Sequence, residues 1–321
     1  MQPPGVKDTT RGNSRRELWT RKLIYPGHTL PTAAAPVLIA VGLALHDRVF
    51  APLPALLAFF AGWLIQFGGV VADNYFNLVR EPDDREHPEL VAALASGLIT
   101  LPGLRTTVAA CWLGALAIGV YLAYVAGPCV IAIGLASIGA AWIYSAGPCA
   151  IGRLGLADPL FFVFFGIVSV AGAYYVQAAP AHGALGWFVP AALPSSAILL
   201  GLPVGALITN ILIIDDIRDR EFDAAKGKRS VAVRFGIAWS RAEFVALLAL
   251  AYLAPFGFWL ELGFSAWALL PLLTLPLAFA LARAVCTRER FAELVPMTPR
   301  AGGLALAYSA LLAAGVAMPA A

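Results

Sequence analysis

Long apolar stretches follow one another along most of the chain, separated by short polar segments. A helix crosses the hydrocarbon core of a bilayer, about 30 Å thick, with about 20 apolar residues. Nine stretches approach or exceed that length, at residues 29–45, 51–72, 104–125, 129–146, 159–179, 189–214, 241–260, 265–284 and 301–319. The pattern therefore predicts an all-α fold, a multi-pass membrane bundle of nine transmembrane helices around a central cavity.

The polar segments between the stretches predict how the bundle is oriented. We interpret residues 1–25, which are polar and basic, as a cytoplasmic leader and residues 26–321 as a single membrane domain. With the N-terminus in the cytoplasm, every Lys and Arg except Arg48 falls into a cytoplasmic segment, where such residues collect in membrane proteins. We therefore expect a protein of the plasma (inner) membrane whose N-terminus is cytoplasmic.

The composition agrees with a lipid environment. Hydrophobic residues make up 60% of the chain and charged residues 13%, whereas about 25% of the residues in soluble domains are charged. The net charge of +3 is dispersed, and a nucleic-acid-binding protein needs a concentrated basic surface. We therefore expect membrane lipid as a partner and no nucleic acid. The cysteines have no metal-ligand spacing, and we expect them to be small buried residues: Cys111, Cys129, Cys149 and Cys286.

Acidic residues are concentrated in two polar segments. Of the 19 Asp and Glu residues, eleven follow either the second or the sixth apolar stretch. Four spans separate the two segments, an even number, so both emerge on the cytoplasmic side. We expect the two segments to face each other over a common cavity.

Within these segments, side-chain oxygens recur every four residues and so lie on one face of a helix. The two stripes are Asp73, Asn77 and Glu81, and Asp215, Asp219 and Asp223. Like charges at this spacing destabilise a helix, which calls for a cation to offset them. Oxygen ligands suit Mg²⁺, which completes its shell with water and phosphate oxygens. The six residues are therefore predicted metal ligands for two or more Mg²⁺ ions around a diphosphate.

Basic residues stand beside the second stripe and offer hydrogen-bond donors to phosphate oxygens. These residues are Arg218, Lys226, Lys228 and Arg229. Their other interpretation, as ordinary cytoplasmic charges, is compatible with phosphate binding.

Residues 215–236, DDIRDREFDAAKGKRSVAVRFG, resemble the second acidic motif of the UbiA superfamily of intramembrane prenyltransferases. The likeness is closest to the branch that prenylates 1,4-dihydroxy-2-naphthoate. Four more segments resemble that branch: YPGHTLPTAAAPVLIA (25–40), SGLIT (96–100), YSAGPCAIGRLGLADPLFFVFFG (144–166) and GAYYVQ (172–177). The resemblance covers residues 25 to about 240 in order.

The resemblance implies a Mg²⁺-dependent prenyltransferase that moves a polyprenyl chain from polyprenyl diphosphate to an aromatic acceptor, dihydroxynaphthoate, with loss of CO₂ to give demethylmenaquinone. It implies an active site that faces the cytoplasm and has Asp73, Asn77, Asp215, Asp219 and Asp223 as catalytic residues. The substrate-binding residues would be Asn74, Tyr75, Tyr144, Arg153, Arg218, Lys226, Lys228 and Arg229. Tyr75, Tyr144 and Tyr174 are also candidates to support an allylic cation through their ring faces.

The first acidic motif departs from the family pattern. Where the superfamily carries three negative charges, Asp73, Asn74, Asn77 and Glu81 carry two. This difference leaves open another aromatic acceptor, such as homogentisate, a hydroxybenzoate or a quinoline. A transporter or a non-catalytic lipid-binding protein is a further alternative, but transporters bind their substrates near the bilayer midplane, and these acids gather at one face. A milder departure is Asp158, which stands where the family has Glu.

Overall fold

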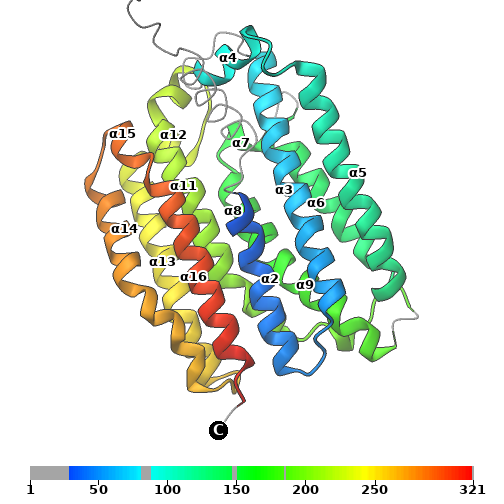
Figure 1. Cartoon of the computed structure of the whole chain (residues 1–321). Helices are drawn as coiled ribbons and strands as arrows, with labels where there is room; N and C mark the ends of the chain where they lie inside the picture. The colour runs from blue at the N-terminus through cyan, green and yellow to red at the C-terminus, as the bar shows by residue number, and fades with distance from the viewer. Residues whose placement is uncertain (1–28, 81–87, 147–149, 184–185, 320–321) are drawn as a thin grey trace, which may run out of the picture.

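The computed structural model describes residues 29–80, 88–146, 150–183 and 186–319. Throughout these ranges the chain is helical, with turns and loops but without strands. Figure 1 shows the long helices packed side by side in one bundle. The prediction of an all-α fold is confirmed.

Eight helical segments in the described ranges have the length and hydropathy of a membrane span. They are α2 (Thr29–His46), α3 (Pro52–Arg80), α5 (Leu101–Ala126), α8 to η2 (Ala157–His182), α10 with α11 (Ser195–Ala225), α13 (Ile237–Leu260), η4 with α14 (Ala266–Thr287) and α15 with α16 (Phe291–Ala317). The remaining predicted span is α6 (Cys129–Ser145), which is apolar but only 17 residues long. With α6 included, the described helices occupy all nine predicted positions.

Several spans are built from consecutive helices. The bounds are α8 (Ala157–Phe161), the π-helical η1 (Phe162–Val168), α9 (Ser169–Ala178), η2 (Ala179–His182), α10 (Ser195–Leu199), α11 (Gly201–Ala225), η4 (Ala266–Thr274), α14 (Leu275–Thr287), α15 (Phe291–Leu294) and α16 (Met297–Ala317). Short connecting helices are α4 (Pro88–Ala95), α7 (Ile151–Leu154), η3 (Pro190–Ala192) and α12 (Val231–Arg234).

Helices α3 and α11 continue past residues 72 and 214, where the apolar stretches predicted their ends, to Arg80 and Ala225. The added segments, DNYFNLVR and DDIRDREFDAA, contain neither Gly nor Pro, so nothing in them breaks a helix. Helix α11 gives way to a turn at Gly227, whose φ of 68° is a left-handed conformation that glycine adopts readily. The predicted stripes therefore lie on regular helix, apart from Glu81, which falls outside the described residues.

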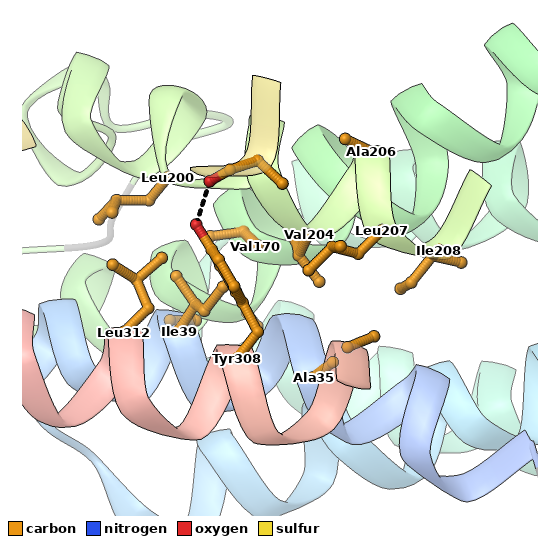
Figure 2. Packing of buried hydrophobic residues seen from close by; sticks show 14 of the residues in the cluster. Ala35, Ile39, Val170, Leu200, Val204, Ala206, Leu207, Ile208, Tyr308 and Leu312 are labelled. Carbon is orange, nitrogen blue, oxygen red and sulfur yellow. Dashed lines mark hydrogen bonds between the residues drawn. The ribbon is translucent and has the colours of Figure 1, made fainter. Parts of the chain in front are cut away.

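Glycines allow α11 to approach η1 closely in the centre of the bundle. A Cβ atom at Gly166 would lie 2.6 Å from the Cα of Gly205, and one at Gly201 would lie 2.8 Å from the Cα of Ile167. Larger side chains would force the two backbones apart, because packed interiors leave little free volume. Tyr308 of α16 is fully buried in the same core, where its hydroxyl donates a hydrogen bond to the Ala251 carbonyl (Figure 2).

The acid-bearing ends of α3 and α11 lie at one end of the bundle. Figure 1 shows α4, α7, α12 and α15 together at this end, and α4 and α12 are the helices that come next in the chain after α3 and α11. This arrangement agrees with the expectation that both acidic segments emerge on the same side. The expected burial of the cysteines holds for Cys111 and Cys129, while Cys286 is half-buried and Cys149 lies outside the described residues.

Candidate functional site

A small polar cavity of about 40 Å³ opens at the acid-bearing end of the bundle. Helices α3, α6 and α7 and the turn after α11 all contribute to its walls. The lining residues are Asp73, Asn77, Arg80, Tyr144, Ser145, Ala150, Gly152, Arg153 and Lys228. Five of the predicted site residues, Asp73, Asn77, Tyr144, Arg153 and Lys228, thus come together around one space, although the chain separates them by up to 155 positions.

Asp73 and Asn77, the two described residues of the first predicted stripe, line this cavity. Asn77 donates a hydrogen bond from Nδ2 to Oδ2 of Asp73 at 3.1 Å, one helical turn away. Arg80, which sequence reasoning treated only as a cytoplasmic charge, is three residues further along the same face and donates to the Ser145 carbonyl at 2.7 Å. Its spacing from Asn77 was the signal that could have placed it in the site.

Two of the chain's own cations form ion pairs with the second stripe. The Arg218 guanidinium lies 2.5 Å from both Asp215 Oδ1 and Asp219 Oδ2, and Lys228 Nζ lies 2.8 Å from Asp223 Oδ1. Asp219 and Asp223 are buried, with 7% and 4% of their surface exposed. Two of the predicted phosphate-binding residues therefore hold carboxylates in this structure, which offsets the repulsion along α11.

Tyr144 connects the two stripes. Its ring lines the polar cavity, and its hydroxyl lies within electrostatic range of Asp73 on α3 and of Asp215 and Asp223 on α11. Lys228 makes a second connection, because it lines the cavity and pairs with Asp223. Asp215, Asp219 and Asp223 do not line the cavity themselves, so α11 reaches it through Lys228, the partner of Asp223.

A set of backbone hydrogen bonds fixes the turn that carries Lys228. The Arg153 guanidinium donates to the Lys226 carbonyl at 2.8 Å, and the Arg229 amide donates to the Arg153 carbonyl at 2.8 Å. Gly155 sits against this turn with a φ of 70°, and a Cβ atom there would lie 2.4 Å from the Arg229 carbonyl oxygen. We call these contacts between residues 153–155 and residues 226–229 the α7 clamp. The Arg229 side chain itself is exposed.

Other predicted residues lie away from the cavity. Asn74 and Tyr75 are on α3 but are not among the lining residues, and Tyr75 packs against the apolar cluster between α3, α4 and α5. Tyr174 does not line the polar cavity, and its hydroxyl donates to Asp47 at 2.5 Å; its role in supporting a cation stays a prediction. Asp47 precedes the start of α3, whereas Asp73 lies near its other end. At a rise of about 1.5 Å per residue, the helix between them is about 30 Å long, so Asp47 and Asp73 lie at opposite ends of α3.

A larger apolar cavity of about 140 Å³ lies between α2, α3, α5, α6, η1 and α9. Three aromatic rings connect it with the polar cavity. The rings of Tyr144 and Phe161 are 5.6 Å apart, and those of Phe161 and Phe165 are 4.9 Å apart. Phe165 lines the apolar cavity, so a row of packed aromatic rings, which we call the aromatic path, leads from the polar cavity to the apolar one.

Comparison with known proteins identifies relatives along nearly the whole chain. Residues 33–293 match the model of the UbiA prenyltransferase family. The 1,4-dihydroxy-2-naphthoate octaprenyltransferase of Mycobacterium tuberculosis is 35% identical over 292 residues, which are 89% of this chain and 92% of that protein. The enzyme of the same name from Escherichia coli is 31% identical over 318 residues, 94% of this chain and 96% of that protein.

Solved structures share the fold. The apo structure of a UbiA homolog from Aeropyrum pernix K1 has a TM-score of 0.67 at 18% identity, covering 89% of this chain and 96% of that one. A UbiA homolog from Archaeoglobus fulgidus bound to DMAPP and Mg²⁺ has a TM-score of 0.52 at 17% identity, with 89% and 98% covered.

Proposed function

The chain belongs to the UbiA prenyltransferase family, and from this premise we propose that it transfers a polyprenyl chain from its allylic diphosphate to 1,4-dihydroxy-2-naphthoate. It is an integral membrane protein and a prenyl-group transferase. The names of the relatives from M. tuberculosis and E. coli support this acceptor. The observation in the molecule that supports the chemistry is the polar cavity, which Asp73 and Asn77 of α3 line together with Lys228, the partner of Asp223 on α11.

The donor atoms of the two stripes fit Mg²⁺, since all are carboxylate or amide oxygens. Mg²⁺ in proteins is held by one or two carboxylates and takes its other ligands from water and substrate phosphates, so the stripes would need to supply only part of its shell. The residues that would hold it are Asp73, Asn77, Glu81, Asp215, Asp219 and Asp223. When bound, Mg²⁺ supplies positive charge that stabilises the leaving diphosphate.

The chain's own cations bind the rest of the diphosphate. Arg80 and Lys228 line the polar cavity, where they donate to phosphate oxygens. Arg218 and Lys228 are held at the site by their pairs with Asp215, Asp219 and Asp223, and they exchange these carboxylates for phosphate oxygens when the substrate binds. Arg153 acts on the same substrate by fixing the Lys228 turn.

The aromatic path carries the isoprenoid. Ionisation of the donor leaves an allylic cation, which the faces of Tyr144, Phe161 and Phe165 stabilise and shield from water. The tail extends past Phe165 into the apolar cavity and from there toward lipid. The acceptor then attacks through its carboxyl-bearing carbon, and loss of CO₂ gives the quinol form of demethylmenaquinone.

We propose the plasma membrane as the location, with the N-terminus and the polar cavity on the cytoplasmic side. The distribution of Lys and Arg supports this orientation. We also propose that residues 1–25 are a leader and that residues 26–321 act as one membrane domain.

A direct test is prenyl transfer by the purified chain with polyprenyl diphosphate, Mg²⁺ and a panel of acceptors: dihydroxynaphthoate, 4-hydroxybenzoate and homogentisate. We expect a prenylated naphthoquinol and one equivalent of CO₂. Exclusive turnover of another acceptor would contradict the naphthoate assignment, and no turnover with any acceptor would contradict the reaction. Glu261→Gln, at an exposed position, serves as the control variant.

A further inference from the structure

Ser145, the last residue of α6, carries a buried hydroxyl at the wall of the polar cavity. The residue is 1% exposed, and among the described residues its Oγ atom has no hydrogen-bond partner. Buried polar atoms are nearly always hydrogen-bonded in folded proteins. Ser145 also lines the polar cavity, so a ligand in that cavity lies next to this residue.

The Ser145 hydroxyl behaves differently from other hydroxyls on the helices of this chain. A Ser or Thr within a helix commonly donates to the carbonyl four residues earlier. Ser137, about two turns before Ser145 on α6, donates in this way to the Ile133 carbonyl at 2.9 Å. Four threonines on other helices make the same contact: Thr106, Thr107, Thr209 and Thr287. Because Ser145 makes no such bond within the described part of the chain, its hydroxyl is available to a ligand.

Two contacts hold the end of α6 against the cavity. Arg80 of α3 donates to the Ser145 carbonyl at 2.7 Å. Gly152 of α7 packs against Tyr144, since a Cβ atom at Gly152 would lie 3.0 Å from the Cζ atom of Tyr144. The carbonyl end of a helix carries partial negative charge, and the Arg80 guanidinium offsets it at this point. Arg80 and Ser145 thus form a corner of the cavity with hydrogen-bond donors, where an anion can bind.

The composition of the cavity wall favours a diphosphate as that anion. The described lining residues include three basic side chains and one acidic side chain: Arg80, Arg153 and Lys228, and Asp73. An excess of positive charge favours a ligand with several negative charges, as a diphosphate has. The carboxylate of an aromatic acceptor carries only one, and its ring needs apolar walls, which the other cavity supplies.

We propose, on the basis of the function proposed above, that the Ser145 hydroxyl donates a hydrogen bond to a non-bridging diphosphate oxygen of the prenyl donor, beside Arg80. A non-bridging oxygen stays with the leaving group, so the bond is kept while the C–O bond between the isoprenoid and the diphosphate breaks. The contact involves neither the isoprenoid nor the aromatic acceptor. Inorganic pyrophosphate should therefore make the same contact.

The test compares wild type, Ser145→Ala, Ser145→Thr and the matched control Ser309→Ala. The Ser309 hydroxyl is also buried and has no partner among the described residues, but Ser309 lines neither cavity. We expect Ser145→Ala to raise the KM for polyprenyl diphosphate by about 10-fold or more, the range for a hydrogen bond to a charged group. The KM for dihydroxynaphthoate should not change. Ser145→Thr keeps the hydroxyl and should stay within about threefold of wild type, as should Ser309→Ala.

Binding of pyrophosphate measures the contact without turnover. Isothermal titration calorimetry of the purified chain with Mg²⁺ and pyrophosphate should show an affinity about 10-fold lower in Ser145→Ala than in wild type. The affinity of Ser309→Ala should equal that of wild type.

An affinity of Ser145→Ala for pyrophosphate within about threefold of wild type would overturn the role of Ser145 and leave the proposed function intact. A rise in the KM for dihydroxynaphthoate alone would also overturn it, because the hydroxyl would then bind the acceptor. Inactivity of wild type toward every aromatic acceptor would instead remove the proposed function and this inference together. If Ser145→Ala does not fold, Ser145→Cys, a weaker donor, replaces it, and unchanged pyrophosphate affinity in that variant would overturn the proposal.

Discussion

The α7 clamp makes a sharp prediction at Gly155. In Gly155→Ala, the φ of 70° costs about 1 kcal/mol for an L-residue, and the new Cβ atom would lie 2.4 Å from the Arg229 carbonyl oxygen. Ordinary van der Waals contact begins at 3.4 Å, so the turn must retreat by about 1 Å. That turn carries Lys228, and a displacement of about 1 Å in a positioning element can reduce the rate about 100-fold.

Gly183→Ala is the matched control. Gly183 has a φ of 71°, and a Cβ atom there meets nothing within 4 Å, so the control carries the same backbone strain without the clash. Steady-state prenyl transfer with titrated donor should show kcat/KM for the diphosphate about 100-fold lower in Gly155→Ala and nearly unchanged in Gly183→Ala. Equal activity of the two variants would refute the clamp as the element that positions Lys228.

Three further predictions concern the metal and its ligands. Activity should disappear with EDTA and return with Mg²⁺ or Mn²⁺, since the candidate metal ligands are oxygens. Full turnover in metal-free buffer would contradict the proposed metal dependence. Asp219→Ala and Asp223→Ala should each lower kcat by about 100-fold, whereas Glu221→Ala, at an exposed position on the same helix, should keep normal activity. If either Asp219→Ala or Asp223→Ala retains more than about a tenth of the wild-type rate, the diphosphate binds elsewhere. Asn77→Asp should lower the Mg²⁺ concentration for half-maximal rate and Asp73→Asn should raise it, because a carboxylate binds a hard cation more strongly than an amide does. Mg²⁺ titrations at a fixed concentration of polyprenyl diphosphate check both, and an unchanged half-maximal Mg²⁺ concentration in both variants would show that residues 73–77 do not bind the metal.

The sequence by itself determined the spans and the acidic stripes. The length of an apolar stretch is a local property, so each stretch predicted one helix without knowledge of the others. Helix α6 lies at its predicted position although it is short. Spacing by four fixed which side chains share a face of α3 or α11 without any knowledge of their neighbours. The ends of these helices were predicted too early, because polar residues end an apolar stretch without ending a helix.

The tertiary structure alone decided which groups meet. The Arg153 guanidinium donates to the Lys226 carbonyl, 73 positions away, and the hydroxyl of Tyr174 donates to Asp47 at the far end of the bundle. Asp158 is buried only because α7, η1 and α11 pack against α8, and among the described residues neither of its carboxylate oxygens has a hydrogen-bond partner. Periodicity shows the direction of a side chain relative to its own helix, whereas its hydrogen bonds depend on the neighbouring helices, which only the packing of the bundle specifies.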